Sequence, residues 1–339
     1  MKKWKACGLV AILSSSLLAA CGGNENDAAS AGEQDKVLQY QSQAGVVTFP
    51  EVAQELGYLD DITLESVSTY VGGPESIQLV ATNQIDFGYA FTGAVLKSAA
   101  KDVPIKAVIA AYGSDDATTT SLYALESSGI TSGKDLIGKK IGVNTLGAHF
   151  EFFLQDYLKQ EGLTAEERKQ VSTVVIPMAT AEQTLRNEQI DAVIMNGLAR
   201  DLALERGGIE TVSRDIDVYE RHFTAGPTVF SDSYIEENPE TVKMFVEGTA
   251  KAIDWLQTTP KEDVIELYTT ILTKRGEEDT VDNTRFFKSP GVSAKGGVLT
   301  DEDFGVWLTT LEEDGTIEKG AVDVADVYTN EFNPFADAK

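Results

Sequence analysis

The chain has 339 residues, a length that accommodates about two domains of ordinary size. Acidic residues outnumber basic residues by 54 to 28, which gives a formal net charge of −26 at pH 7. This balance argues against nucleic-acid binding, which requires basic patches. It leaves a small anion open as a ligand, because backbone dipoles act locally whereas distant charges are screened by salt.

The first 20 residues are typical of an export signal. Lysines within residues 2–5 precede a mostly apolar run over residues 8–18, which is too short to span a bilayer as a helix. The sequence Leu-Ala-Ala-Cys that ends at Cys21 resembles the bacterial lipobox, in which the cysteine becomes the lipidated first residue. A plain secretory signal with an incidental cysteine is the alternative.

Cleavage before Cys21 would leave an exported mature chain. Residues 21–36 are mostly small and polar, so we expect a lipidated, flexible tether there. Cys7 is the only other cysteine and is removed with the signal, so no intrachain disulfide can form. Loss of three lysines lowers the net charge from −26 to −29. We therefore expect a protein anchored on the outer face of the cell membrane and stabilised by a hydrophobic core.

From residue 37 onwards, short β-rich runs alternate with helical patterns, which predicts an α/β fold with a largely parallel sheet. Pro50 and Pro74 suit the first turns of two helices, and Gly57 suits the end of the first of these helices. The first set of strands is predicted over residues 37–41, 62–68, 86–91, 105–111 and 121–125.

The stretch over residues 133–158 carries the clearest functional signal. A short strand ends near Asn144, a tight loop follows, and a helix is predicted to begin near Ala148. Its apolar face consists of Phe150, Phe153, Leu154, Tyr157 and Leu158. A helix start directs unpaired N–H groups and partial positive charge at what precedes it, so the loop could bind an anion or a polar ligand. An ordinary strand-to-helix turn is the alternative.

The second half continues the alternation and then becomes helical. Further strands are predicted over residues 171–177 and 190–195, with a helix over residues 181–187. The tripeptide Gln-Ile-Asp precedes a strand at residues 84–86 and again at residues 189–191, which gives weak support for two lobes built alike. Long helical patterns then follow over residues 239–257, 261–273 and 300–311, and we expect this segment to return to the first lobe.

Few residues could carry catalysis or bind a metal ion. The sequence has two histidines, His149 and His222, and it lacks a Gly-x-Ser-x-Gly elbow, a Walker loop and a Gly-x-Gly-x-x-Gly fingerprint. We predict no catalytic residue, no metal site and no cofactor. His149 lies in the first turn of the predicted helix, where the dipole disfavours its charged form. It could donate a hydrogen bond to a ligand as a neutral imidazole, or it could be a capping or surface histidine.

Polar and glycine-containing loops follow the carboxyl ends of five predicted strands. In open α/β sheets, this edge is where ligands bind, so the loops are expected to converge on one cleft. The five loops lie at residues 43–46, 72–73, 92–93, 144–149 and 196–197.

Four sequence segments, in this order and spacing, resemble the substrate-binding proteins of ABC importers in the nitrate/sulfonate/taurine group, which is related to thiamine-precursor binding proteins. The segments are Val-Ala-Gln-Glu-Leu-Gly-Tyr at residues 52–58, Gln-Ile-Asp-Phe-Gly at 84–88, Leu-Ile-Gly-Lys-Lys-Ile-Gly-Val at 136–143 and Asn-Pro-Glu-Thr-Val at 238–242. The resemblance covers nearly the whole mature chain.

The resemblance implies a two-lobed, type II periplasmic-binding-protein-like fold, in which each lobe is a mixed sheet flanked by helices. Two chain crossings, expected near residues 124–128 and 222–228, would join the lobes. Residues 37–125 would form the first part of lobe 1, residues 126–224 lobe 2, and residues 225–339 the return to lobe 1. Such a protein is not an enzyme. It captures a small molecule as a monomer and delivers it to a permease with its ATPase.

The resemblance also indicates which residues bind the ligand. Family members often hold a sulfonate on backbone N–H and hydroxyl groups at positions that match Thr145 to His149, although this sequence has fewer hydroxyls there. The predicted ligand-binding residues are Gln43, Ala44, Gly45, Gly73, Glu75, Phe91, Thr92, Gly93, Asn144, Thr145, Gly147, Ala148, His149 and Asn196.

We predict a sulfonate or taurine-like anion as the ligand, held without an arginine from the five loops. The alternative is an aminopyrimidine thiamine precursor or another nitrogen-containing molecule, which Glu75 could meet and on which Tyr89 and Phe91 could stack. Two other functions are alternatives. An enzyme of thiamine-pyrimidine synthesis would need a cysteine-rich motif that is missing here, whereas a sensor module without transport stays open.

Overall fold

The structure is a computed structural model that describes residues 34–337. The predicted export signal, Cys21 and most of the predicted tether therefore lie outside the described residues. Between residues 34 and 337, no helix combines the length and the apolar character needed to cross a membrane.

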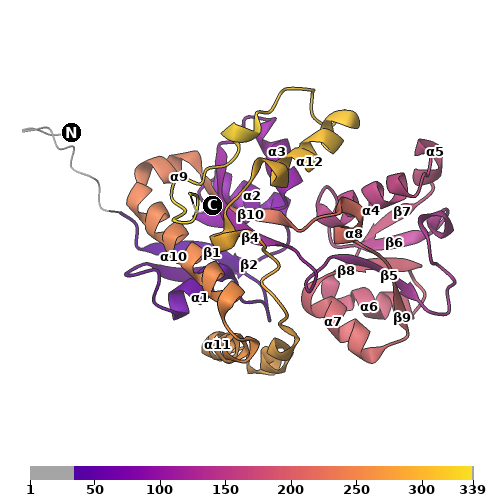
Figure 1. The fold of residues 1–339 in the computed structure, drawn as a ribbon, viewed down its shortest axis with the longest axis horizontal. Helices are drawn as coiled ribbons and strands as arrows, with labels where there is room; N and C mark the ends of the chain where they lie inside the picture. The colour runs from indigo at the N-terminus through magenta and orange to yellow at the C-terminus, as the bar shows by residue number, and fades with distance from the viewer. Residues whose placement is uncertain (1–33, 338–339) are drawn as a thin grey trace, which may run out of the picture. The chain divides into compact units, whose positions relative to one another are not determined.

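The strands form separate sheets that belong to two lobes, shown in Figure 1. Lobe 1 contains a parallel pair and a three-stranded antiparallel sheet in the order β3–β10–β4. Two of its connecting helices start within a few residues of a strand end, which brings their first turns to one edge of the sheets. The elements are β1 (Val37–Ser42), α1 (Phe49–Glu55), β2 (Thr63–Thr69), α2 (Gly73–Ala81), β3 (Phe87–Tyr89), α3 (Thr92–Ala99), β4 (Ile105–Ser114) and β10 (Phe223–Ser231).

Lobe 2 contains one five-stranded sheet in the order β7–β6–β8–β5–β9. Strand β6 is parallel to β7 and β8, whereas β5 is antiparallel to β8 and β9. The prediction of mixed sheets flanked by helices is confirmed, but the expectation of a largely parallel sheet is wrong. The elements are β5 (Ser121–Leu125), η1 (Gly133–Leu136), β6 (Lys140–Val143), α4 (His149–Gln160), α5 (Ala165–Arg168), β7 (Ser172–Val175), α6 (Met178–Arg186), β8 (Ala192–Met195), α7 (Gly197–Arg206), β9 (Ile209–Arg214) and α8 (Asp215–Tyr219).

The chain beyond β10 is helical and packs on lobe 1, as predicted from its pattern. Helix α10 contacts α1 and η3, and α12 contacts α3. The elements are α9 (Asp232–Glu237), α10 (Pro239–Thr258), α11 (Lys261–Lys274), η2 (Glu278–Phe286), η3 (Lys295–Gly297), α12 (Asp301–Glu313) and η4 (Val324–Asp326).

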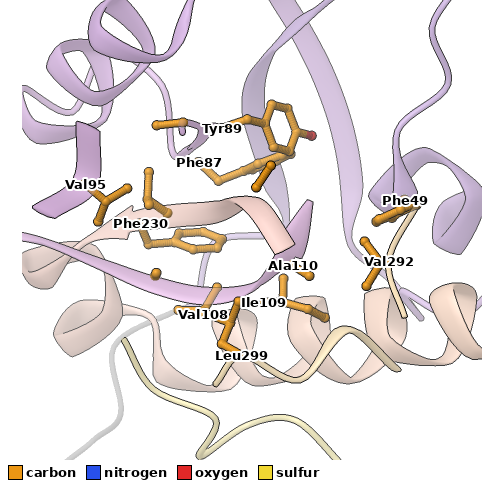
Figure 2. Packing of buried hydrophobic residues seen from close by; sticks show 14 of the residues in the cluster. Phe49, Phe87, Tyr89, Val95, Val108, Ile109, Ala110, Phe230, Val292 and Leu299 are labelled. Atoms are coloured by element: carbon orange, nitrogen blue, oxygen red, sulfur yellow. The ribbon is translucent and has the colours of Figure 1, made fainter. Parts of the chain in front are cut away.

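Aromatic and branched side chains fill the core of lobe 1 (Figure 2). The Phe87 ring lies 4.7 Å from the Phe245 ring and 5.8 Å from the Phe230 ring, measured between centroids. Figure 2 shows Phe230 between the Phe87 side and a group that includes Ile109 and Leu299. In lobe 2 the predicted apolar face of α4 is buried throughout, which confirms the helical pattern read from residues 150–158.

The two chain crossings lie at different positions from those expected. Strand β5 pairs with lobe 2 strands, so the first crossing falls at residues 115–120 rather than 124–128, and residues 121–125 group with lobe 2. The second crossing precedes Phe223, because residues 223–231 form the central strand of the lobe 1 sheet. Asp215, at the start of α8, bonds both ends of the first crossing: its N–H donates to Thr120 O (2.9 Å), and the Ser114 hydroxyl donates to Asp215 Oδ2 (2.6 Å).

Candidate functional site

The first predicted loop, after β1, is held by the end of α11. The guanidinium of Arg275 donates to Gln43 O (2.9 Å), and the Gly45 N–H donates to Glu277 Oε2 (2.7 Å). Gly45 has φ of +71°, and a methyl group added there would lie 3.7 Å from Leu198 Cδ2 of lobe 2. The side chains of Gln43 and Ala44 are exposed. The loop backbone is therefore preorganised, and it approaches the first turn of α7.

The second loop contacts lobe 2 through Gly72, which lies beside Thr145. A methyl group added at Gly72 would lie 3.7 Å from Thr145 Cγ2 of lobe 2. Gly73 has a packing role, since its added methyl would lie 3.0 Å from Ala90 Cα and so would separate α2 from β3. Glu75 is exposed in the first turn of α2.

The third loop builds the start of α3 rather than offering free polar groups. The Thr92 hydroxyl is buried and donates to Ala225 O (3.0 Å). Phe91 is 1% exposed, and a methyl group added at Gly93 would lie 2.6 Å from its ring. All three residues are buried in contacts with other parts of the protein, which the sequence pattern does not reveal.

The loop before α4 is bonded at Gly147 by residues of both lobes. Gly147 has φ of +70°, its N–H donates to Glu151 Oε2 (2.5 Å), and its carbonyl accepts a hydrogen bond from Lys97 Nζ (2.8 Å). Burial lowers the pKa of the Lys97 ammonium, an effect that nearby Glu151 opposes. Thr145 is half-buried beside Gly72. A lobe 1 lysine thus touches the predicted ligand loop of lobe 2, and it was missed because it lies within a helix, far away in sequence.

Two asparagines follow adjacent parallel strands of lobe 2. Asn144 follows β6 and Asn196 follows β8, so both lie at the carboxyl edge of the sheet. The Asn144 Oδ1 atom is buried and has no hydrogen-bond partner among the described residues. Asn196 is half-buried at the start of α7. An unpaired buried acceptor is costly in a folded protein, so Asn144 is a candidate ligand contact.

His149 is neither a capping nor a surface residue, and that alternative is wrong. Its side chain is 5% exposed, and its ring stacks on Phe91 with centroids 5.5 Å apart. Burial lowers the pKa of His149 to about 3, so the imidazole is neutral at pH 7. Its Nε2 lies 3.6 Å from Oδ2 of Asp215, whose pKa burial raises to about 6. The structure places His149 at the chain crossings, within the aromatic cluster around Trp307.

Lobe 1 contributes Gln41, Tyr70 and Tyr112, which were not predicted, beside Tyr89, which was considered only as a stacking residue for an aminopyrimidine. Gln41 is 2% exposed; its Nε2 donates to Thr69 O (3.2 Å), and its Oε1 is buried without a partner within residues 34–337. Tyr70 and Tyr89 meet edge to face with centroids 6.5 Å apart, and Tyr112 packs over Gly226. Burial raises the pKa of all three tyrosines. All three tyrosines lie near the carboxyl ends of β2, β3 and β4, and this position in the sequence could have identified them as site candidates.

Comparisons with known proteins agree with this architecture. A family model described as "NMT1/THI5 like" matches residues 46–263. Proteins of Brucella abortus (strain 2308) and Brucella suis biovar 1, each described as a "putative binding protein", are 24% identical over 215 residues, or 63% of this chain. The matched region covers 64% of those relatives, which is less than two thirds of their length.

Solved structures show the same fold. The alkanesulfonate-binding protein SsuA from Xanthomonas axonopodis pv. citri, bound to MOPS, matches with a TM-score of 0.67 and 16% identity, over 88% of this chain and 99% of that one. The periplasmic nitrate-binding protein NrtA from Synechocystis PCC 6803 matches with a TM-score of 0.65 and 12% identity, over 88% and 87%. The predicted periplasmic-binding-protein fold is therefore confirmed.

Proposed function

Since the chain belongs to the NMT1/THI5-like family, we propose that it is an extracytoplasmic solute-binding protein that closes on a small molecule and delivers it to an ABC importer. One observation carries the proposal. Each lobe presents a buried, unpaired amide oxygen at a strand end, Gln41 Oε1 on lobe 1 and Asn144 Oδ1 on lobe 2. A solute with hydrogen-bond donors, enclosed between the lobes, would satisfy both oxygens.

The ligand class that suits these groups best is a small aminosulfonate such as taurine. Its ammonium group carries three donors for the unpaired amide oxygens. Its sulfonate suits the first turn of α4, where backbone N–H groups lack intrahelical partners, with the Lys97 ammonium close by. The Glu151 carboxylate already accepts from the Gly147 N–H, so the sulfonate would bind beside that group rather than on it.

A thermal-shift panel tests this proposal. The panel contains taurine, ethanesulfonate, nitrate, an aminopyrimidine and a simple amine. A ligand at a hundredfold excess over its dissociation constant stabilises the folded state by about 2.7 kcal/mol, which gives a clear shift. We expect taurine to raise the melting temperature more than ethanesulfonate, which leaves the two amide oxygens unpaired. No response to any sulfonate would overturn the ligand assignment.

An aminopyrimidine is the second candidate, and the tyrosines favour it. Tyr70, Tyr89 and Tyr112 could flank a planar ring, and exocyclic N–H groups would pair with Gln41. In the same panel, a shift with the aminopyrimidine alone would select this candidate. Exposed Glu75 would then be the residue to substitute next.

The proposal includes the cellular arrangement read from the N-terminal sequence. The mature protein would be a monomer held at the outer face of the membrane by lipid on Cys21, with no catalytic activity of its own. Its partners would be a permease and the associated ATPase. A neighbouring permease gene would support transport over a sensor role.

A further inference from the structure

Lys97 links lobe 1 to the proposed ligand loop of lobe 2. It lies in the last turn of α3, and its Nζ donates to Gly147 O over 2.8 Å. The same ammonium lies 5.4 Å from the centroid of the Phe152 ring on α4. Two residues before Gly147, Thr145 meets Gly72 of lobe 1. Lys97 therefore acts at a place where the lobes are already in contact.

The loop residue that Lys97 binds is constrained on its other side as well. The Gly147 N–H donates to Glu151 Oε2 (2.5 Å), and φ of +70° favours glycine there. A methyl group added at Gly147 would lie 2.9 Å from Lys97 Nζ. Glu151 of lobe 2 thus holds the peptide group before Gly147, and Lys97 of lobe 1 holds the one after it, so the two residues together set the path of residues 144–148.

We infer that Lys97 is a positioning residue that couples lobe closure to the shape of the ligand loop. In the closed arrangement its ammonium binds the Gly147 carbonyl and fixes residues 144–148 for the solute. In an open arrangement this bond is lost and the loop is held by Glu151 alone. The inference rests on the proposed function, because a coupling of this kind serves a protein that closes on a ligand.

The Lys97–Gly147 bond favours closure because it joins the two lobes and exists only when they are closed. It therefore shifts the open–closed equilibrium toward the closed state. Other bonds also join the lobes, including Arg285 to Glu205 (2.6 Å) and Lys288 to Asp201 (2.9 Å). Those bonds reach α7 and do not touch residues 144–148. Substitution of Lys97 is therefore expected to change both the open–closed equilibrium and the order of residues 144–148. Loss of the Arg285 or Lys288 bond is expected to change the open–closed equilibrium alone.

Distance measurement between spin labels tests the closure part without any ligand. Labels are placed at Val67→Cys on β2 and Val175→Cys on β7, both exposed, after the two native cysteines are replaced by serine. We expect Lys97→Met, which keeps the stem over Phe152, to lower the closed-to-open ratio about tenfold. Lys97→Arg should restore the parent distribution. The matched control Lys101→Met, an exposed lysine just beyond the same helix, should leave it unchanged.

Amide hydrogen exchange tests the loop part. Exchange in residues 144–148 should accelerate in Lys97→Met and stay at the parent rate in Lys288→Met. Identical distance distributions for parent and Lys97→Met, or identical exchange in this loop, would overturn the inference. If Lys97→Met lowers the melting temperature too far for these experiments, Lys97→Leu, which also lacks a hydrogen-bond donor, replaces it, with the same outcomes expected.

Taurine titration separates this inference from the proposed function. Where the parent binds taurine, Lys97→Met should bind about tenfold more weakly through faster dissociation, and equal affinity would contradict the coupling. Where the parent binds neither taurine nor any other member of the panel, the proposed function fails. The label distances and the exchange rates still decide the role of Lys97.

Discussion

At the residue scale, His149 and Asp215 form a buried pair. Their protonation has opposite effects on the stability of the fold. His149 Nε2 lies 3.6 Å from Asp215 Oδ2, and Asp215 also accepts from the Ser114 hydroxyl. Burial disfavours the charged form of both groups, so the pKa of His149 falls to about 3 and that of Asp215 rises to about 6. The folded protein therefore binds fewer protons than the unfolded chain at His149 and more at Asp215.

His149→Phe should make the protein more acid-resistant. In the parent, the unfolded chain protonates this histidine near its ordinary pKa of 6.5, whereas the folded protein does so near 3, so stability falls as the pH drops between them. The phenyl ring keeps the aromatic contacts and removes this titration. Relative to the parent, we expect constant stability above pH 7 and a gain of about 1.4 kcal/mol per pH unit below 6.5. Urea unfolding across pH 4–8 measures this difference.

Asp215→Asn is the control, because it should change the pH dependence of stability in the opposite direction to His149→Phe. The raised pKa means that folded Asp215 gains its proton near pH 6, whereas the unfolded chain gains it near 3.8, so the parent recovers stability as the pH falls through this window. The asparagine variant lacks that recovery. Parallel stability curves for the parent and both variants would contradict the assignment of these pKa shifts.

Gln41→Leu tests the unpaired amide on lobe 1. The substitution removes the buried oxygen that we assign to the ligand, and a hydrogen bond to a charged ammonium contributes about 1.5–3 kcal/mol. We expect most of the taurine-induced thermal shift to disappear. Gln39→Leu on the same strand is the control, because Gln39 is exposed and bonds Glu65 instead. An unchanged taurine shift in Gln41→Leu would remove Gln41 from the site.

At the scale of elements, sequence periodicity predicted helices better than it predicted strand membership. The apolar face of α4 and the long helix α10 follow directly from spacing, because each buries one continuous stripe. Strand β10, which contains Gly226 and Pro227, was not predicted, because residues 222–228 were assigned to a chain crossing. The strand tolerates this glycine and this proline where its register with β4 shifts. Lys97 was missed for a different reason, since its contact exists only once the lobes meet.

Two glycine substitutions test the packing of these elements. A methyl group at Gly88 of β3 would lie 2.3 Å from Ser76 Oγ and 3.0 Å from Val80 Cγ2, so α2 would have to move. We expect Gly88→Ala to lower the free energy of unfolding by about 1–3 kcal/mol. Gly305→Ala, in the interior of α12 with nothing within 4 Å of the added methyl, should instead raise it by about 0.5–1 kcal/mol. Chemical denaturation distinguishes the two, and equal effects would contradict the packing account.

At the scale of the whole molecule, the fold was largely readable from the sequence and the site only in part. The order of elements placed the helix starts at the sheet edges correctly. The structure gives the residues of the predicted loops different surroundings: Thr145 lies beside Gly72 of the opposite lobe, whereas Thr92 and His149 are buried. Periodicity cannot predict these surroundings, because they depend on which side chains the opposite lobe covers.

The membrane anchor is a separate prediction for the whole protein, because Cys21 lies outside the described residues. Cys21→Ala should move the protein from the membrane fraction to the soluble fraction, since lipid attachment needs the thiol. Fractionation of cells that produce the parent and the variant measures this. The anchor assignment is wrong if the variant remains bound to membranes as firmly as the parent.

Calorimetric titration of taurine into the purified protein, with Thr145→Val measured beside the parent, shows whether the protein binds an aminosulfonate at the proposed site. We expect one taurine per chain for the parent and little or no heat for Thr145→Val, which removes the hydroxyl of the loop and keeps the methyl group that lies beside Gly72. The unliganded variant should unfold at the same temperature as the parent. Saturable binding of taurine with equal affinity to both proteins would contradict the placement of the site, and absence of binding to the parent would contradict the proposed ligand.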